Sequence, residues 1–176
     1  MRDPETKCLS LEAALVWRGE LRRRRRTLVF TNGCFDLMHR GHMTYLAAAR
    51  RCGDALLVAM NSDASVAAIK GPGRPVLPQQ DRAYMLASLE AVDAVVLFGT
   101  PNVTELLRQL APEVYVKGGD YTENTLEPNE YRVLRQMGCR IELVPAVAGL
   151  STTELIRRAS LAVGNESRGG HREPRS

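Results

Sequence analysis

The chain has 176 residues, of which 44% are hydrophobic and 25% are charged, and its formal net charge is +4. These values are typical of one ordinary domain with a real core, and they leave little room for a second domain. No stretch approaches the roughly 20 apolar residues of a membrane span, and the N-terminal residues lack the apolar core of a secretory signal. We therefore expect a cytoplasmic protein without a membrane partner.

Five consecutive arginines, Arg22 to Arg26, account for the positive balance, because removing their charges from +4 leaves −1. Such a run can bind nucleic acid or an anionic surface. We favour a cationic helix end that is stabilised by the helix dipole and then solvated, since no aromatic residue interleaves the arginines. We expect no nucleic-acid partner.

Short apolar runs alternate with amphipathic stretches along the chain. The pattern predicts helices from Ser10 into the arginine run and over residues 42–51, 64–70, 81–89, 103–110, 131–137 and 152–162. It predicts strands over residues 27–31, 56–60, 94–98, 114–116 and 141–144. These elements form one predicted domain over residues 10–163, after an N-terminal extension over residues 1–9. Residues 164–176 are rich in Gly, Arg and Ser, and we expect them to form a disordered tail.

The predicted strands are apolar along their whole length, which indicates a parallel sheet covered by helices on both faces. The predicted fold is therefore α/β, a doubly wound, five-stranded parallel sheet of the Rossmann-like kind. Ligands of such sheets bind beyond the carboxyl ends of the strands, where the strand order reverses. We expect the loops after the first, second, fourth and fifth strands to converge there.

The loop after the first strand contains two of the three histidines, His39 and His42. They are three residues apart, so they project from the same face of a helical turn. Gly33 lets the backbone approach a ligand, and Gly41 keeps the helix N-terminus open to phosphate. An imidazole beside a phosphate is driven towards its protonated form, which donates two hydrogen bonds. We predict a phosphate site, and the alternative is a pair of helix-start histidines with local hydrogen bonds.

Two further loops carry charged candidates. After the second strand, Asp63 either caps the next helix or accepts hydrogen bonds from sugar hydroxyls. Lys70 and Arg74 follow on a loop punctuated by Gly and Pro, which suits a clamp over a polyphosphate, although a plain surface loop would look similar. Arg82 is a third candidate phosphate ligand.

The loops after the last two strands complete the candidate site. After the fourth strand, Lys117 supplies charge, Gly118 and Gly119 permit close approach and Asp120 is an acceptor, although a tight turn with incidental charges is the alternative. After the fifth strand, residues 151–154 spell a capping box, and a capped helix N-terminus can also bind phosphate.

Cys34 lies inside this predicted site. The four cysteines, Cys8, Cys34, Cys52 and Cys139, show no CxxC pair and no metal-ligand spacing, so we expect free thiols. No histidine stands one turn from Cys34 as an obvious base, and a small packing residue is therefore preferred over a nucleophile.

The segment Gly33-Cys34-Phe35-Asp36-Leu37-Met38-His39-Arg40-Gly41-His42, with Ser151-Thr152-Thr153 at a helix start, resembles the cytidylyltransferase-like superfamily of nucleotidyltransferases. A finer resemblance, over about residues 8–163, is to the bacterial D-glycero-β-D-manno-heptose 1-phosphate adenylyltransferases. It rests on residues 30–36, 61–66, 70–76, 81–82 and 116–121. The Lys-Gly-Pro-Gly-Arg-Pro loop distinguishes these adenylyltransferases from the glycerol-phosphate cytidylyltransferases, whose sequence differs in this loop.

This resemblance implies that ATP and heptose 1-phosphate give ADP-heptose and pyrophosphate in a stand-alone enzyme without a fused sugar kinase. It also implies Mg²⁺ held by the nucleotide phosphates, and a homodimer or higher homo-oligomer. The implied catalytic residues are His39, His42, Lys70 and Arg74. The implied nucleotide-binding residues are Thr31, Gly33, Cys34, Phe35, His39, Gly41, His42, Arg82, Lys117, Gly118, Ser151, Thr152 and Thr153. The implied sugar-phosphate residues are Asp36, Asn61, Asp63, Lys70, Arg74, Gly119, Asp120 and Tyr121.

Two stretches differ from the sequences that are usual in that family. Residues 77–80 lie beside the clamp loop, so nucleotide or sugar preference could differ, and residues 127–130 are expected at the surface. The nearest rival function is the same chemistry with another sugar or polyol phosphate, or with CTP or GTP. Two different classes of function remain open as well, namely a nucleotide-binding module without turnover and a nucleic-acid binder built on the arginine run.

Overall fold

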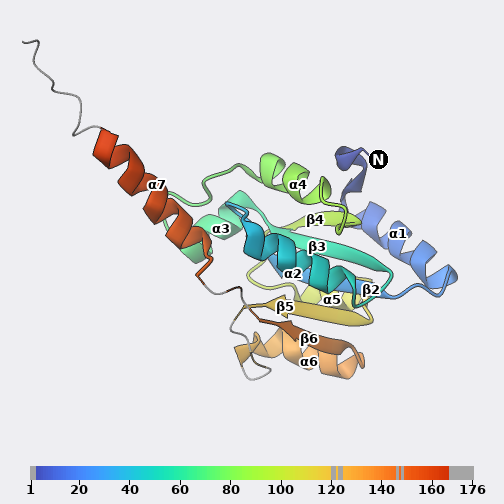
Figure 1. The fold of residues 1–176 in the computed structure, drawn as a ribbon. Helices are drawn as coiled ribbons and strands as arrows, with labels where there is room; N and C mark the ends of the chain where they lie inside the picture. Colours follow the sequence, from blue (N-terminus) through green and yellow to red (C-terminus); the bar gives the residue numbers. More distant parts are fainter. Residues whose placement is uncertain (1–2, 120–121, 123–124, 146, 148, 167–176) are drawn as a thin grey trace, which may run out of the picture.

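The computed structural model describes residues 3–119, 122, 125–145, 147 and 149–166 (Figure 1). It contains one parallel sheet in the order β1-β4-β3-β2-β5-β6. The strands are β1 (Cys8–Leu9), β2 (Leu28–Gly33), β3 (Ala55–Asn61), β4 (Ala94–Phe98), β5 (Val114–Gly118) and β6 (Arg140–Val144). From β2 the chain first adds β3 and β4 on one side and later β5 and β6 on the other. The strand order therefore reverses at β2, where the fold rules place a ligand site.

The helices cover both faces of the sheet. They are α1 (Leu11–Arg23), α2 (Arg40–Arg50), α3 (Asp63–Lys70), α4 (Gln79–Ala87), α5 (Thr104–Leu110), α6 (Pro128–Gln136) and α7 (Thr152–Glu166), after a short 3₁₀ helix, η1 (Pro4–Lys7). Buried side chains of α1, α5 and α6 pack on one face of the sheet, and those of α2 and α4 pack on the other. Helix α7 runs away from the sheet (Figure 1).

Strand β3 shows why the sheet needs both layers. All seven of its residues are buried. Leu57 and Ala59 face the core under α1 and α5, whereas Leu56, Val58 and Met60 face the core under α2 and α4. Burying each large side chain contributes about 1.5–3 kcal/mol, so both faces stabilise the fold.

The predicted fold class is confirmed, with one strand more than expected. The additional strand is β1, which has two residues and pairs with β4 at one edge of the sheet. A strand of two residues is too short to show a periodicity in the sequence. It was therefore not predicted, and its residues lie within the expected N-terminal extension. Helix α7 reaches Glu166, so residues 164–166 are helical rather than part of the expected tail. Residues 167–176 of that tail lie outside the described residues.

The arginine run stands at a helix end, as predicted. Arg22 and Arg23 occupy the last turn of α1, and Arg24 is its C-cap. Among the described residues, no helix is long and apolar enough to cross a membrane.

Candidate active site

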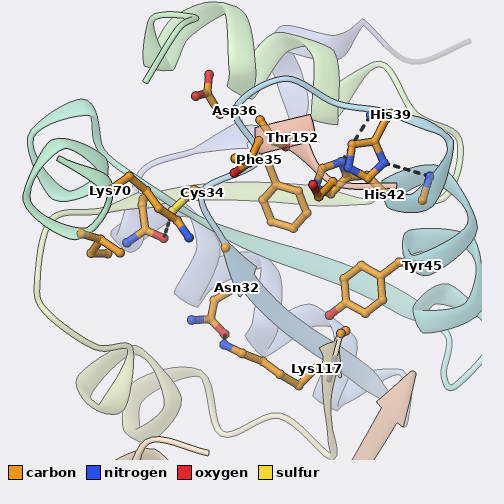
Figure 2. A pocket seen from close by; sticks show the side chains of 18 of the residues that line it. Asn32, Cys34, Phe35, Asp36, His39, His42, Tyr45, Lys70, Lys117 and Thr152 are labelled. Atoms are coloured by element: carbon orange, nitrogen blue, oxygen red, sulfur yellow. Dashed lines mark hydrogen bonds between the residues drawn. The ribbon is translucent and has the colours of Figure 1, made fainter. Parts of the chain in front are cut away.

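A cavity of about 780 Å³ opens beyond the carboxyl ends of β2 and β5, a volume typical of small-molecule sites. The sequence-predicted residues that line it are Gly33, Cys34, Phe35, Asp36, His39, Gly41, His42, Asn61, Lys70, Arg74, Lys117, Gly118, Gly119, Ser151, Thr152 and Thr153. Figure 2 shows the histidines and Thr152 on one side, Lys70 and Cys34 on the other, and Asn32 with Lys117 apart from both. The loops after four strands therefore converge.

The two histidines cap helix α2 and face the cavity. His39 is the N-cap, and its Nδ1 accepts a hydrogen bond from the backbone N–H of Gly41 at 3.1 Å. Nδ1 of His42 accepts from the backbone N–H of His39 at 3.3 Å. The local hydrogen bonds of the alternative interpretation are thus present. They leave the hydrogen of each neutral ring on Nε2, where it can be donated to a ligand.

Burial keeps both imidazoles neutral in the absence of a ligand. Burial, together with the neighbouring His39, lowers the pKa of His42 to about 4. Burial also lowers the pKa of His39. A bound phosphate would act in the opposite direction, because an adjacent negative charge favours the imidazolium form. The protonated pair expected from the sequence therefore requires an anion.

Gly41 serves the histidine pair as well as the helix N-terminus. A Cβ atom at this position would lie 2.9 Å from the ring of His39. A side chain would consequently push His39 away from its capping position, so the HxGH spacing depends on glycine for steric reasons.

The N-terminus of α7 meets the histidine segment. Ser151 Oγ accepts from the backbone N–H of Glu154 at 3.1 Å, which is half of the predicted capping box, whereas the Glu154 carboxylate pairs with Arg157 and Arg158. The Thr152 hydroxyl donates to the carbonyl oxygen of Leu37 at 3.0 Å. Two helix N-termini therefore lie beside the imidazoles, an arrangement that favours an anion.

Asp36, for which a sugar contact was expected, lines the cavity and is held by donors of the protein. The residue is 2% exposed, and its carboxylate accepts from Arg74 Nε at 2.6 Å and from the backbone N–H groups of Val76 and Leu77 at 2.8 and 3.1 Å. Three donors thus occupy the carboxylate, which holds the loop that follows α3.

Arg82 and Asp63 are corrected from ligand contacts to structural residues. Arg82 is fully buried, outside the cavity lining, and donates to the carbonyl oxygens of Leu77, Cys34 and Asn61 and to Asp63 Oδ1 at 2.7 Å. Asp63 also exchanges two hydrogen bonds with Gln79 at 3.0 and 3.1 Å. The N-cap of α3 is Ser62 rather than Asp63. Through Leu77 and Gln79, the unusual stretch at residues 77–80 therefore anchors the end of the loop that connects α3 and α4.

The remaining predicted residues are placed as follows. Thr31 is fully buried and bonded to the Tyr45 hydroxyl, so it lies outside the cavity lining. Burial raises the pKa of the Cys34 thiol, whose sulfur lies 3.8 Å from Asn61 Oδ1. Asp120 and Tyr121 lie outside the described residues.

A polar network at the end of β2 was not predicted from the sequence. Lys117 Nζ donates to Asn32 Oδ1 at 2.9 Å, and the Tyr115 hydroxyl lies 2.9 Å from the same oxygen. Since Lys117 donates to that oxygen, the amide hydrogens of Asn32 point elsewhere, and Asn32 lines the cavity. Burial lowers the pKa of Lys117, whereas the nearby Glu130 raises it.

Glu130 contradicts the expected surface position of residues 127–130. It is 3% exposed and accepts from the Tyr115 hydroxyl at 3.0 Å and from the backbone N–H of Val103 at 3.1 Å. Its position three and four residues before the buried Val133 and Leu134 is the signal that could have found it, because those spacings share one helix face.

Residues 30–158 match the family model described as cytidylyltransferase-like. The chain belongs to the cytidylyltransferase-like family. This cytidylyltransferase-like chain is 49% identical over 137 residues to the bifunctional protein HldE of Syntrophotalea carbinolica, which covers 78% of the chain and 28% of that protein. It is 44% identical over 152 residues to the protein of the same name from Methylobacillus flagellatus, covering 86% and 31%. The chain thus spans about a third of the length of these relatives.

Two solved structures share the fold of this cytidylyltransferase-like chain. The lipopolysaccharide core biosynthesis protein from Thermoplasma volcanium superposes with a TM-score of 0.57 at 22% identity, covering 69% of this chain and 97% of that one. A pantoate-β-alanine ligase from Francisella tularensis superposes with a TM-score of 0.55 at 14% identity, covering 88% and 77%. At these identities the likeness concerns the fold.

Proposed function

We propose that this domain transfers AMP from ATP to D-glycero-β-D-manno-heptose 1-phosphate and releases pyrophosphate. The observation that carries the proposal is the pair of imidazoles at the N-terminus of α2, directly beside the N-terminus of α7. The segments that carry the two resemblances, to the cytidylyltransferase-like superfamily and to the heptose 1-phosphate adenylyltransferases, together supply most of the cavity lining. Relatives named bifunctional protein HldE are 42–50% identical to the chain.

In the proposed reaction, an oxygen of the sugar phosphate attacks the α-phosphorus of ATP in line with the leaving pyrophosphate. A bond forms between that oxygen and the α-phosphorus, while the bond to the bridging oxygen of the β-phosphate breaks. A phosphate monoester is already anionic near neutral pH, so no general base is required. The chain's contribution is positioning and charge stabilisation.

The side chains divide this work by position. The Nε2–H groups of His39 and His42 and the N-termini of α2 and α7 are suited to the triphosphate. Lys70 and Arg74, on the other side of the cavity, are suited to the second phosphorylated substrate (Figure 2). Two anionic substrates thus find separate groups of donors in one cavity.

Mg²⁺ is part of the proposal, held by oxygens of the triphosphate. The described residues contain no cluster of three His, Cys, Asp or Glu side chains that could hold a metal ion, and the Asp36 carboxylate already has three donors. When bound, the ion would neutralise charge on the pyrophosphate.

The test is pyrophosphate release with each of four nucleoside triphosphates against a panel of sugar 1-phosphates. We expect release with ATP and the heptose 1-phosphate. Release only with CTP, GTP or another sugar or polyol phosphate would replace the substrate assignment. Nucleotide binding without pyrophosphate release from any pair would instead support a binding module.

A further inference from the structure

The loop between α3 and α4, residues 71–78, carries a cavity-lining cation and is sterically open at its start. Gly71 and Gly73 have positive φ angles of 87° and 79°, and no atom lies within 4 Å of where their Cβ atoms would be. The far end is fixed instead, because Gln79 is bonded to Asp63 and Arg82 holds the carbonyl oxygen of Leu77. Arg74 lies between the open start and the fixed end.

A single buried carboxylate fastens the middle of this loop. Asp36 accepts from Arg74, Val76 and Leu77, and the side chain of Asp36 is 1% exposed. Burial alone would raise the pKa of Asp36, but the bonds from the two backbone N–H groups and from Arg74 lower it below its ordinary value. The carboxylate is therefore charged and is held by three donors of the protein.

The contact with Asp36 determines which edge of the Arg74 guanidinium remains available. Asp36 takes the Nε hydrogen, and the structure records no acceptor for the two terminal nitrogens among the residues that it describes. The Arg74 side chain is 17% exposed and lines the cavity. The terminal edge, which suits bidentate binding of a phosphate, thus remains for a ligand.

We propose that Asp36 is a positioning residue, which fixes the loop so that the terminal edge of Arg74 meets a substrate phosphate. This inference rests on the proposed function. Asp36 lies three residues before His39 on the same short segment. One segment therefore sets the distance between the imidazole pair and the loop cation before substrates arrive, which lowers the entropic cost of aligning two anions.

The variant Asp36→Asn separates this role from simple support of the loop. The Asn oxygen can still accept from the N–H groups of Val76 and Leu77, but its NH₂ group cannot accept from Arg74. We expect the KM of one phosphorylated substrate to rise about 10- to 100-fold, the range of a lost charge-assisted hydrogen bond. A rise for the sugar phosphate or for ATP identifies which phosphate Arg74 binds.

Glu113→Gln is the matched control. Glu113 also accepts from an arginine, Arg18, and from a backbone N–H, that of Leu28, but it lies at the start of β5, at the opposite end of the strands. We expect this variant to lose stability while both KM values stay within about twofold of wild type. Equal KM values in Asp36→Asn and wild type would overturn the proposal.

A double-mutant cycle with Arg74→Gln tests whether Asp36 acts through Arg74. We expect the double variant to be no worse than Arg74→Gln alone, because the guanidinium that Asp36 positions is already gone. If the KM changes of the two single variants multiply in the double variant, the proposal is overturned.

Hydrogen exchange supplies a readout that does not need turnover. In Asp36→Ala the amides of Val76 and Leu77 should exchange about tenfold faster or more than in Asp36→Asn, since only the Asn variant keeps their acceptor. Equal exchange in the two variants would overturn the fastening role. If wild type releases no pyrophosphate, the proposed function fails, while this exchange still decides whether Asp36 holds the loop.

Discussion

The backbone N–H of His39 donates to Nδ1 of His42, and the two imidazole rings lie 4.1 Å apart. Each histidine of the motif thus takes part in capping the helix that it begins. The hydrogen bonds at Nδ1 set the tautomer and the orientation of each ring and leave Nε2–H for a ligand. The capping role and the phosphate-binding role are therefore compatible. A catalytic donor pair is pre-organised here by the same contacts that start α2.

Removal of one imidazole should cost catalysis far more than stability. We expect His42→Ala to lower kcat about 10²- to 10³-fold, the usual effect of losing one pre-organised donor to a developing negative charge. Steady-state pyrophosphate release measures this, and a thermal melt shows whether the variant is folded. A kcat within about tenfold of wild type would contradict the assigned role.

Folding stability without ligand should fall as the pH is lowered from about 6.5 to about 4. The pKa of His42 is lowered to about 4 in the folded chain from 6.5. The unfolded chain therefore binds a proton in this window and the folded chain does not, so acid favours unfolding. Urea unfolding at pH 4.5 and pH 7 measures the change, and His42→Gln should show a smaller fall. An equal fall in both proteins would rule out His42 as its source.

Arg82 should contribute to the folding stability of the protein. Its guanidinium serves three carbonyl oxygens and Asp63, all of which Arg82→Met would leave without that donor. We expect a loss of about 3 kcal/mol in the free energy of unfolding, as for other broken buried pairs. The control is Arg108→Met, which removes an exposed pair with Glu105 and should cost less than about 1 kcal/mol. Similar losses in the two variants would contradict the central structural position of Arg82.

The Tyr115 hydroxyl should matter because it joins Asn32 to Glu130. The one hydrogen of this hydroxyl serves Asn32 Oδ1 or Glu130 Oε2, so Tyr115→Phe leaves a buried acceptor with one donor fewer, and we expect a cost of about 1–3 kcal/mol in the free energy of unfolding. Tyr84→Phe is the control, since Tyr84 is 50% exposed. Denaturant unfolding compares the two, and equal stability of both variants would contradict the network.

The order of helices and strands was predictable because each is long enough to show its periodicity. Strand β3 is apolar over most of its seven residues, and helix α2 begins within the HxGH motif. Strand β1 was missed, since two residues carry no pattern. The observed boundaries differ from the predicted ones by a few residues where residues without an apolar side chain, such as Asn61 and Gly118, continue a strand.

The loops that form the candidate site were predictable from the carboxyl ends of the strands, but the partners of their charged side chains were not. Asp36 and Arg74 are 38 residues apart in the chain, and Arg82 and Cys34 are 48 apart. No local pattern distinguishes a charge that meets a ligand from one that meets a distant backbone group. Asp63 and Arg82 were therefore assigned to ligands although they lie outside the cavity lining and bind the protein itself, and the protein donors of Asp36 were not foreseen.

The most direct test of the central claim is the analysis of products after wild-type protein is incubated with ATP and D-glycero-β-D-manno-heptose 1-phosphate. We expect one pyrophosphate and one ADP-heptose for each ATP consumed. ATP and heptose 1-phosphate that remain unchanged, in a protein shown to be folded, would contradict it.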